Sequence, residues 1–305
     1  MMIPPEAVQC VRDFFTDTIE LGHNANFSEL EYGKAKRNYD RISKELMKAE
    51  LPNPSSFRYS KLSLDELKQL MSDILNKIFD NKYKEEIKYL SSLIVTEKNH
   101  NPFLATLAEK YHNGVLIPEQ IYISDKMSSI EVVSTAHELI HAMLTKYIVN
   151  EYNKVLNNVH YQEFLSILIE YVVCYELSQL IKEDKLTEKH NIIRLYHNQE
   201  QIQETTTAQN LNLSLLPIND QEIMKLYVEY QLHNSYGYIL SDIYSFHLLD
   251  VYKKDSKALV NIVSSIIDGK KCINDLISFY KLNLSRNDII FKYINRIDET
   301  SVLKL

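Results

Sequence analysis

The chain has 305 residues, a net charge of -7, and 45% hydrophobic and 25% charged residues, which is typical of a soluble globular protein of one large domain or two. This acidic balance argues against nucleic acid as a partner, because phosphate binding requires a clustered basic surface. No stretch approaches 18 uncharged apolar residues, so we expect no membrane partner. Three cysteines without a pairing pattern, Cys10, Cys174 and Cys272, indicate reduced thiols and a cytoplasmic protein.

The first 112 residues are predicted to form a helical part of the fold. The chain has only 5 Gly and 7 Pro, which favours long helices joined by short connections. Ser63 and Glu66 form a Ser-x-x-Glu capping box at the start of one of these helices. The predicted helices cover residues 4–20, 28–50, 63–81, 83–92 and 102–112. We find no candidate site in this part, which we separate from a catalytic core over residues 113–305.

The pattern changes at Gly114. Residues 115–124 are rich in β-branched side chains and are interrupted by Pro118, which predicts an edge strand or a hairpin. A strand edge beside a functional site can bind an extended peptide through main-chain hydrogen bonds. A purely structural strand is the alternative interpretation, and the two are compatible.

The segment from Thr135 to Met143 contains the pattern His-Glu-x-x-His, formed by His137, Glu138 and His141. Residues four apart lie on one face of a helix, so both imidazoles can reach one metal ion. The glutamate lies one position round and can act as general base on a water bound to zinc. Two solvated or core-packed histidines are the alternative, but an apolar surround would leave such histidines in need of a partner.

Ser128 and Glu131 form a second capping box, which predicts that the helix carrying this motif begins just before Ser129.

A strongly apolar helix predicted near residues 161–171 carries Glu163 and Glu170, seven residues apart and therefore on one face. An ionised glutamate in such surroundings is costly unless it is paired or bound to metal. A catalytic zinc needs a third protein ligand and an open fourth position. We assign Glu163 as that ligand and Glu170 as a group that orients a ligating imidazole. Glu176 is the substitute candidate for the third ligand.

The segment Ser129–His141 together with the spacing Glu163-x-x-Ser166-x-x-x-Glu170 resembles the thimet oligopeptidase and oligoendopeptidase F family of zinc metallopeptidases. The resemblance implies a mainly α-helical, zincin-type catalytic domain that encloses a cleft and cuts short, extended peptides. It also implies that Glu163 is the third zinc ligand. The chain departs from the family in two respects: Ile140 stands where the family has glycine, and the chain is shorter. The second departure implies a more open cleft.

The resemblance extends to a tyrosine-rich segment over residues 226–238, which ends in Tyr236-Gly237-Tyr238. In the family, a histidine and tyrosines of this segment donate hydrogen bonds to the oxyanion and to the substrate backbone. The corresponding residues here are Tyr230 and Tyr238, with His233 as the histidine candidate in a flexible loop. A donor aimed at developing charge contributes on the order of 3 kcal/mol.

The remaining chain is predicted to be a polar linker over residues 205–220 and packing helices over residues 239–254, 256–268, 271–281 and 286–297.

The sequence therefore predicts a zinc metalloendopeptidase with one zinc ion and a peptide substrate. Two alternatives stay open. One is a catalytically inactive peptide-binding protein that retains the fold, and the other is a protease specific for a single precursor or protein.

Overall fold

The computed structural model describes residues 29–98, 106–112, 115–145, 159–181, 183, 185–210, 218–282 and 286–301. Over residues 29–36, 106–119, 145, 159–162, 208–209 and much of 218–236 it describes the backbone alone. The helix predicted over residues 4–20 lies outside the described residues.

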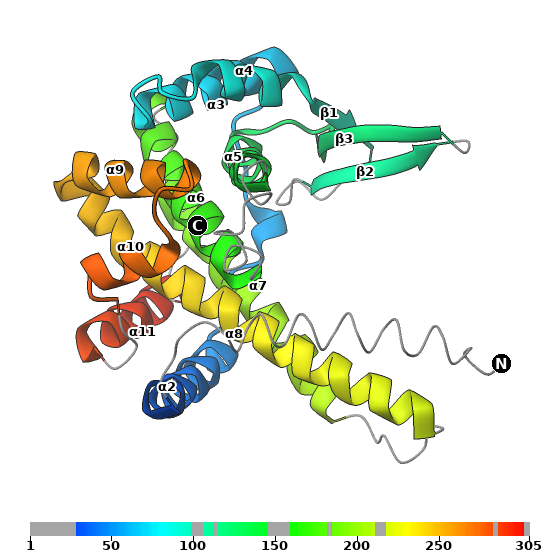
Figure 1. Ribbon diagram of the computed structural model, residues 1–305, viewed down its shortest axis with the longest axis vertical. Helices are drawn as coiled ribbons and strands as arrows, with labels where there is room; N and C mark the ends of the chain where they lie inside the picture. Colours follow the sequence, from blue (N-terminus) through cyan, green and yellow to red (C-terminus); the bar gives the residue numbers. More distant parts are fainter. Residues whose placement is uncertain are drawn as a thin grey trace.

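The described chain is mainly α-helical, with a small sheet at one side (Figure 1). The fold-class prediction is confirmed. In addition to a 3-10 turn at Pro54–Ser56, the helices are α2 (Glu29–Lys48), α3 (Leu64–Ile78), α4 (Lys84–Ser92), α5 (Ser129–Thr145), α6 (Val159–Ile181), α7 (Leu186–Gln209), α8 (Ile218–Lys254), α9 (Ser256–Ile267), α10 (Ile273–Phe279) and α11 (Asn287–Ser301).

The sheet has three strands in the order β1-β3-β2. They are β1 (Ile94–Glu97), β2 (Thr106–His112) and β3 (Val115–Ser124). β2 and β3 form an antiparallel hairpin, and β1 adds in parallel to β3. Residues 115–124 therefore form one strand and not a hairpin by themselves, because the hairpin is made with β2. The helix predicted over residues 102–112 is wrong in its described part. Helix-forming residue types in β2 are overridden by pairing with β3.

β3 is the central strand, so its interpretation as an edge strand is also wrong. Pro118 is tolerated because the β2–β3 register shifts between the pairs Ala108–Gln120 and Lys110–Ile117. β1 pairs only with residues 121–124, so it does not need a hydrogen bond from the proline.

Both capping boxes contribute to helix starts. The Ser63 backbone N–H donates to Glu66 Oε2 at 2.7 Å, and the Glu66 N–H donates to Ser63 Oγ at 3.3 Å. At the start of α5, the Ser128 N–H and hydroxyl both donate to Glu131 Oε2, at 2.6 Å and 3.1 Å. The helix with the His-Glu-x-x-His motif therefore begins at the predicted place, directly after β3.

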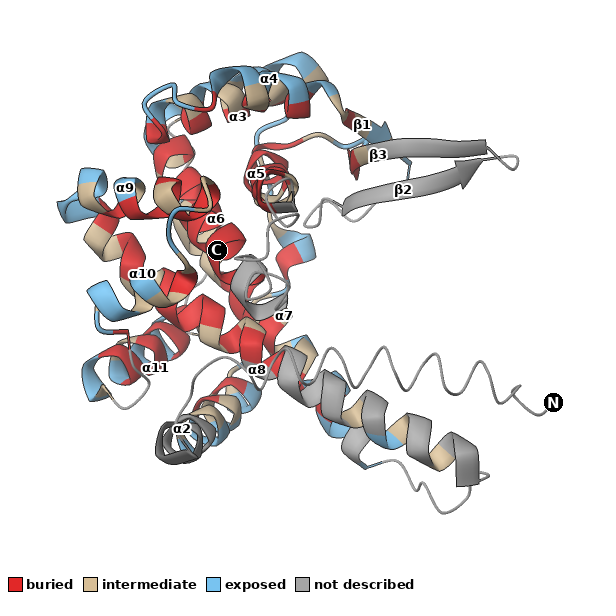
Figure 2. Cartoon of the chain, in the orientation of Figure 1, coloured by how far each residue is buried: buried red, intermediate tan, exposed pale blue. Residues whose placement is uncertain are grey.

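α6 lies at the centre of the helical body and packs most extensively against α8 and α5. Figure 2 shows that α5 and α6 are mostly buried. By length and composition alone, Glu163–Ile181 would be able to cross a membrane, which the sequence analysis did not recognise. However, 72% of its apolar window is buried inside the protein, as in the core helix of a soluble protein.

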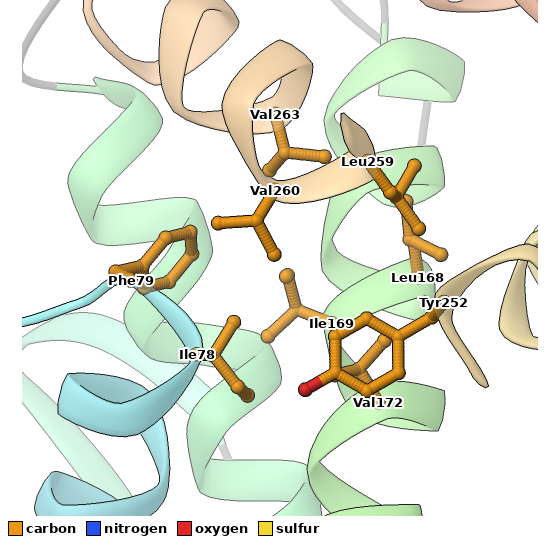
Figure 3. A pocket seen from close by; sticks show the side chains of 9 residues that line it. All are labelled: Ile78, Phe79, Leu168, Ile169, Val172, Tyr252, Leu259, Val260 and Val263. Atoms are coloured by element: carbon orange, nitrogen blue, oxygen red, sulfur yellow. The ribbon is translucent and has the colours of Figure 1, made fainter. Parts of the chain in front are cut away.

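A small apolar cavity of about 10 Å³ lies between α3, α6, α8 and α9, which is about enough for one water molecule (Figure 3). Its lining is almost wholly aliphatic and aromatic carbon, so it offers little recognition chemistry. The lining residues are Ile78, Phe79, Leu168, Ile169, Val172, Tyr252, Leu259, Val260 and Val263.

Two predictions about the C-terminal half are corrected. α7 continues to Gln209, so residues 205–209 of the predicted linker are helical. α8 begins at Ile218 instead of near residue 239, so the tyrosine-rich segment is helical and the flexible loop predicted around His233 is absent. Residues 211–217 of the linker lie outside the described residues. The helices predicted after residue 255 are confirmed as α9, α10 and α11.

Candidate metal centre

Three predicted metal ligands converge where α5 crosses α6. His137 and His141 project from successive turns of α5, and their Nε2 atoms are 3.0 Å apart. Glu163, near the start of α6, places Oε2 3.4 Å from His137 Nε2 and Oε1 3.4 Å from His141 Nε2. The structure therefore brings together the three side chains that the sequence assigns to the metal.

These separations fit a tetrahedral zinc ion. Zinc bonds of about 2.0–2.1 Å to nitrogen and oxygen place neighbouring ligand atoms roughly 3.3 Å apart. The Nε2 atoms of His137 and His141 lie 3.0 Å apart, so each imidazole can direct a lone pair at the same cation. Glu163 Oε2 is buried and has no hydrogen-bond partner among the described side chains. Two imidazoles and one carboxylate are also a typical ligand set of catalytic zinc, so the residues present fit the ion.

Burial and charge oppose each other at this centre. Burial alone would lower the pKa of His137, but its interactions with Glu163 and Glu170 outweigh burial and raise the pKa to about 10. Burial would raise the pKa of Glu163, but its interactions with His137 and His141 hold it well below the usual range. In the absence of metal, a proton therefore occupies the ligand set, and a cation competes with that proton.

Of the predicted catalytic residues, two have described side chains. Glu138 follows His137 on α5 and is partly exposed, as a base that meets substrate has to be. Tyr238 of α8 forms a side-chain hydrogen bond with Glu163. Burial, the charge of Glu163 and this hydrogen bond raise the pKa of Tyr238 well above its usual range. The charge of Glu138 acts on Tyr238 in the same direction. The side chains of Tyr230 and His233 lie outside the described residues, so their assigned roles stay predictions.

Glu170 contacts His137 as the sequence analysis proposed. Its Oε2 lies 3.0 Å from His137 Nδ1, the ring nitrogen that faces away from the other ligands. A carboxylate there accepts the Nδ1–H and leaves the Nε2 lone pair for a metal, which fixes tautomer and ring orientation.

Glu176 is not available as a metal ligand. Lys77 Nζ lies 2.5 Å from its Oε2, and the Tyr252 hydroxyl donates to its Oε1 at 2.7 Å. The substitute assignment is therefore wrong, because α6 turns this carboxylate towards α3 and α8.

The sequence analysis missed residues of α7. His190, Arg194 and His197 follow a helical spacing of four and three, so they share one face, and that spacing is the signal that would have identified them. His190 Nε2 lies 2.7 Å from Glu170 Oε1, and the ring of His197 meets the ring of Tyr238 edge to face at 5.8 Å. Burial, assisted by the positive charge of Arg194, lowers the pKa of His197 to about 4, which leaves a neutral imidazole beside Tyr238.

No protein-family model and no curated protein matches the chain. Among solved structures, the fold is similar to the crystal structure of a Bacillus anthracis str. Ames protein described as a candidate oligoendopeptidase F, with a TM-score of 0.56 and 12% sequence identity. The match covers 94% of this chain and 59% of that structure. This likeness shows the fold alone, which is mainly helical in both chains.

Proposed function

We propose that this protein is a zinc-dependent endopeptidase that hydrolyses bonds in short or extended peptides. The observation that carries the proposal is the convergence of His137, His141 and Glu163 at the spacing of a tetrahedral zinc site, with Glu138 beside it. The similarity of the fold to a candidate oligoendopeptidase F supports the same class of activity.

His137, His141 and Glu163 would hold the ion, and Glu170 would fix the His137 ring. When bound, zinc lowers the pKa of a water molecule towards about 7 and polarises a carbonyl. Glu138 then accepts the proton of the attacking water and delivers it to the leaving amine as the peptide bond breaks.

We assign Tyr238, which interacts with Glu163, as a donor of a hydrogen bond to the oxyanion. Its high pKa keeps the phenol protonated at neutral pH, which a donor requires. Tyr230 and His233 remain proposed donors on the family resemblance alone.

The substrate is proposed to lie extended beside the sheet. β2 is an edge strand, and both β2 and β3 pack against α5, the helix that carries the two histidines. An edge strand next to a metal centre can align a peptide by main-chain hydrogen bonds, whatever its side chains. We further propose that the protein works in the cytoplasm, consistent with the burial of α6 and the free thiols of Cys174 and Cys272.

The test is Glu138→Gln, which removes the base and keeps the size of the side chain. We expect the variant to bind zinc as tightly as the parent but to lose nearly all cleavage of a fluorescence-quenched peptide library. The parent should lose activity with a chelator and regain it with zinc. A parent that binds zinc and peptides but cleaves none would favour the inactive peptide-binding alternative. Cleavage of one protein only would favour a dedicated protease.

A further inference from the structure

Glu170, the carboxylate behind His137, is itself held by two residues of α7. His190 contacts Glu170 Oε1 at 2.7 Å, and an Arg194 terminal nitrogen lies 3.6 Å from Oε2. All these side chains are nearly inaccessible to solvent: 2% of His190, 7% of Arg194 and 10% of Glu170 is exposed. The orientation of the Glu170 carboxylate therefore depends on where α7 places the imidazole of His190 and the guanidinium of Arg194.

Arg194 is in turn held by Asp242 of α8. Arg194 Nε lies 3.4 Å from Asp242 Oδ1, and the Asp242 side chain has no solvent exposure. The carboxylate of Asp242 also accepts hydrogen bonds from four further donors on α6, α7 and α11. These donors are Tyr171 at 2.6 Å, Asn198 at 2.9 Å, Arg296 at 3.1 Å and Tyr293.

Charge balances across this chain of contacts, since Glu170 and Asp242 face Arg194 and Arg296. Burial opposes ionisation of Asp242, but Arg296 and Arg194 outweigh it and hold the pKa of Asp242 below its usual range. Buried ion pairs add little net stability compared with well-packed apolar residues. A network of two carboxylates and two arginines that ends on the predicted ligand His137 therefore indicates a geometric role in addition to packing.

We propose that Arg194 and Asp242 are positioning residues of the metal centre, which transmit the placement of α8 and α11 through Glu170 to the ring of His137. This inference rests on the proposed function. Arg194 holds Glu170 in place from behind, and Asp242 holds Arg194 in one orientation by occupying its Nε. Arg296 and Tyr293 link the C-terminal helix α11 to the same carboxylate. α11 is thus part of the support of the metal centre, in addition to its packing role.

The experiment compares Asp242→Asn with Glu176→Gln in the full chain. Both substitutions replace a buried carboxylate by an amide of the same size. Glu176 is the control because it lies on α6 only six residues beyond Glu170 but has Lys77 and Tyr252 as its partners. Zinc affinity is measured by competition with a chelating dye, the coordination geometry by the visible absorption of the cobalt-substituted protein, and stability by unfolding of the metal-free protein.

We expect Asp242→Asn to weaken zinc binding about tenfold and to change the cobalt spectrum, as removal of outer partners of metal ligands does. Glu176→Gln should keep the zinc affinity and cobalt spectrum of the parent, whatever its stability. If Asp242→Asn does not fold, Tyr293→Phe removes one donor to Asp242, keeps the ring and decides the question with the same two measurements.

Parent-like zinc affinity and cobalt spectrum in these variants would overturn the positioning role and leave the proposed function intact. A parent chain that binds no zinc would overturn both.

Discussion

α6 carries three glutamates that are buried to a similar degree but have different partners. Counted over the whole residue, Glu163, Glu170 and Glu176 are 8%, 7% and 7% exposed, so burial alone does not distinguish them. Glu163 and Glu170 face imidazoles on α5, whereas Glu176 faces Lys77 and Tyr252. The comparison shows that the partner decides whether a buried carboxylate belongs to a site or to packing.

The nature of each partnership supports this distinction. The side chain of Lys77 is 60% exposed, so Glu176 receives a charge that water shares. Glu163 instead meets two nitrogens that are close to each other, and it keeps one buried oxygen without a hydrogen-bond partner among the described side chains. The first arrangement is complete without a ligand. The second brings two imidazole nitrogens and a carboxylate to one point, as the proposed cation requires.

The largest effect is expected for Glu163→Gln, which removes the carboxylate of the ligand set. Zinc affinity should fall by more than about 100-fold, beyond the loss typical of outer partners, and peptide cleavage should fall with it. Equilibrium dialysis followed by metal analysis measures the first quantity. Retention of a tightly bound zinc ion in this variant would show that the ligand set is wrong.

A comparison of the zinc affinities of Glu170→Gln and Glu176→Gln tests the difference between these two glutamates. Because Glu170 contacts His137, its amide variant should bind zinc roughly 10- to 100-fold more weakly. Glu176→Gln keeps an acceptor for Tyr252 and gives up a solvent-shared charge, so its free energy of unfolding should change by only about 1 kcal/mol, with parent-like zinc affinity. Calorimetric zinc titration and urea unfolding check the pair. Equal zinc affinities of the two variants would remove the distinction between Glu170 and Glu176.

Tyr238→Phe tests the donor and keeps all three proposed metal ligands. The variant should retain zinc, while kcat/KM falls about 100-fold through the loss of one hydrogen bond to the oxyanion. Steady-state kinetics on a quenched peptide, with zinc content as control, measure this. An unchanged kcat/KM would assign the donor role to another residue, such as Tyr230, His233 or His197.

The smallest effect concerns Glu131, a buried glutamate that accepts hydrogen bonds from the backbone N–H and the hydroxyl of the neutral Ser128. Burial, opposed by these hydrogen bonds, raises its pKa from 4.5 to about 7. The folded state therefore binds more protons between these values, and its free energy of unfolding falls as pH rises from about 4.5 to 7. Glu131→Gln, which stays neutral, should weaken this fall in pH-dependent urea unfolding.

Glu66, in the exposed capping box, is the matched control. Hydrogen bonds from Ser63 lower the pKa of Glu66, so it stabilises the folded state above its unfolded pKa and less as pH falls. Glu66→Gln should alter the pH dependence in the opposite direction to Glu131→Gln. The same direction for both variants would contradict the assigned pKa shifts.

Local signals in the sequence predicted most helices and the centre of the site. The spacing of His137 and His141 fixes their common face in any helix, and Glu163 was found because an ionised residue stood in an apolar run. The strand at Thr106–His112 was missed because its residue types favour helix, and only its pairing with β3 decides the matter. Glu176 was a wrong substitute because sequence periodicity does not reveal that Lys77 of α3 occupies it.

By itself, the sequence determined the helical class, the start of α5 and the two-histidine pattern, because capping and helical periodicity act over a few residues. Only the tertiary structure decided which carboxylate meets the histidines and that Tyr238 of a continuous helix interacts with Glu163. It also decided that α7, α8 and α11 support Glu170. Those contacts join residues from 20 to more than 50 positions apart, such as Glu170 with His190 and Asp242 with Arg296. Their formation depends on how helices pack, which no local pattern encodes.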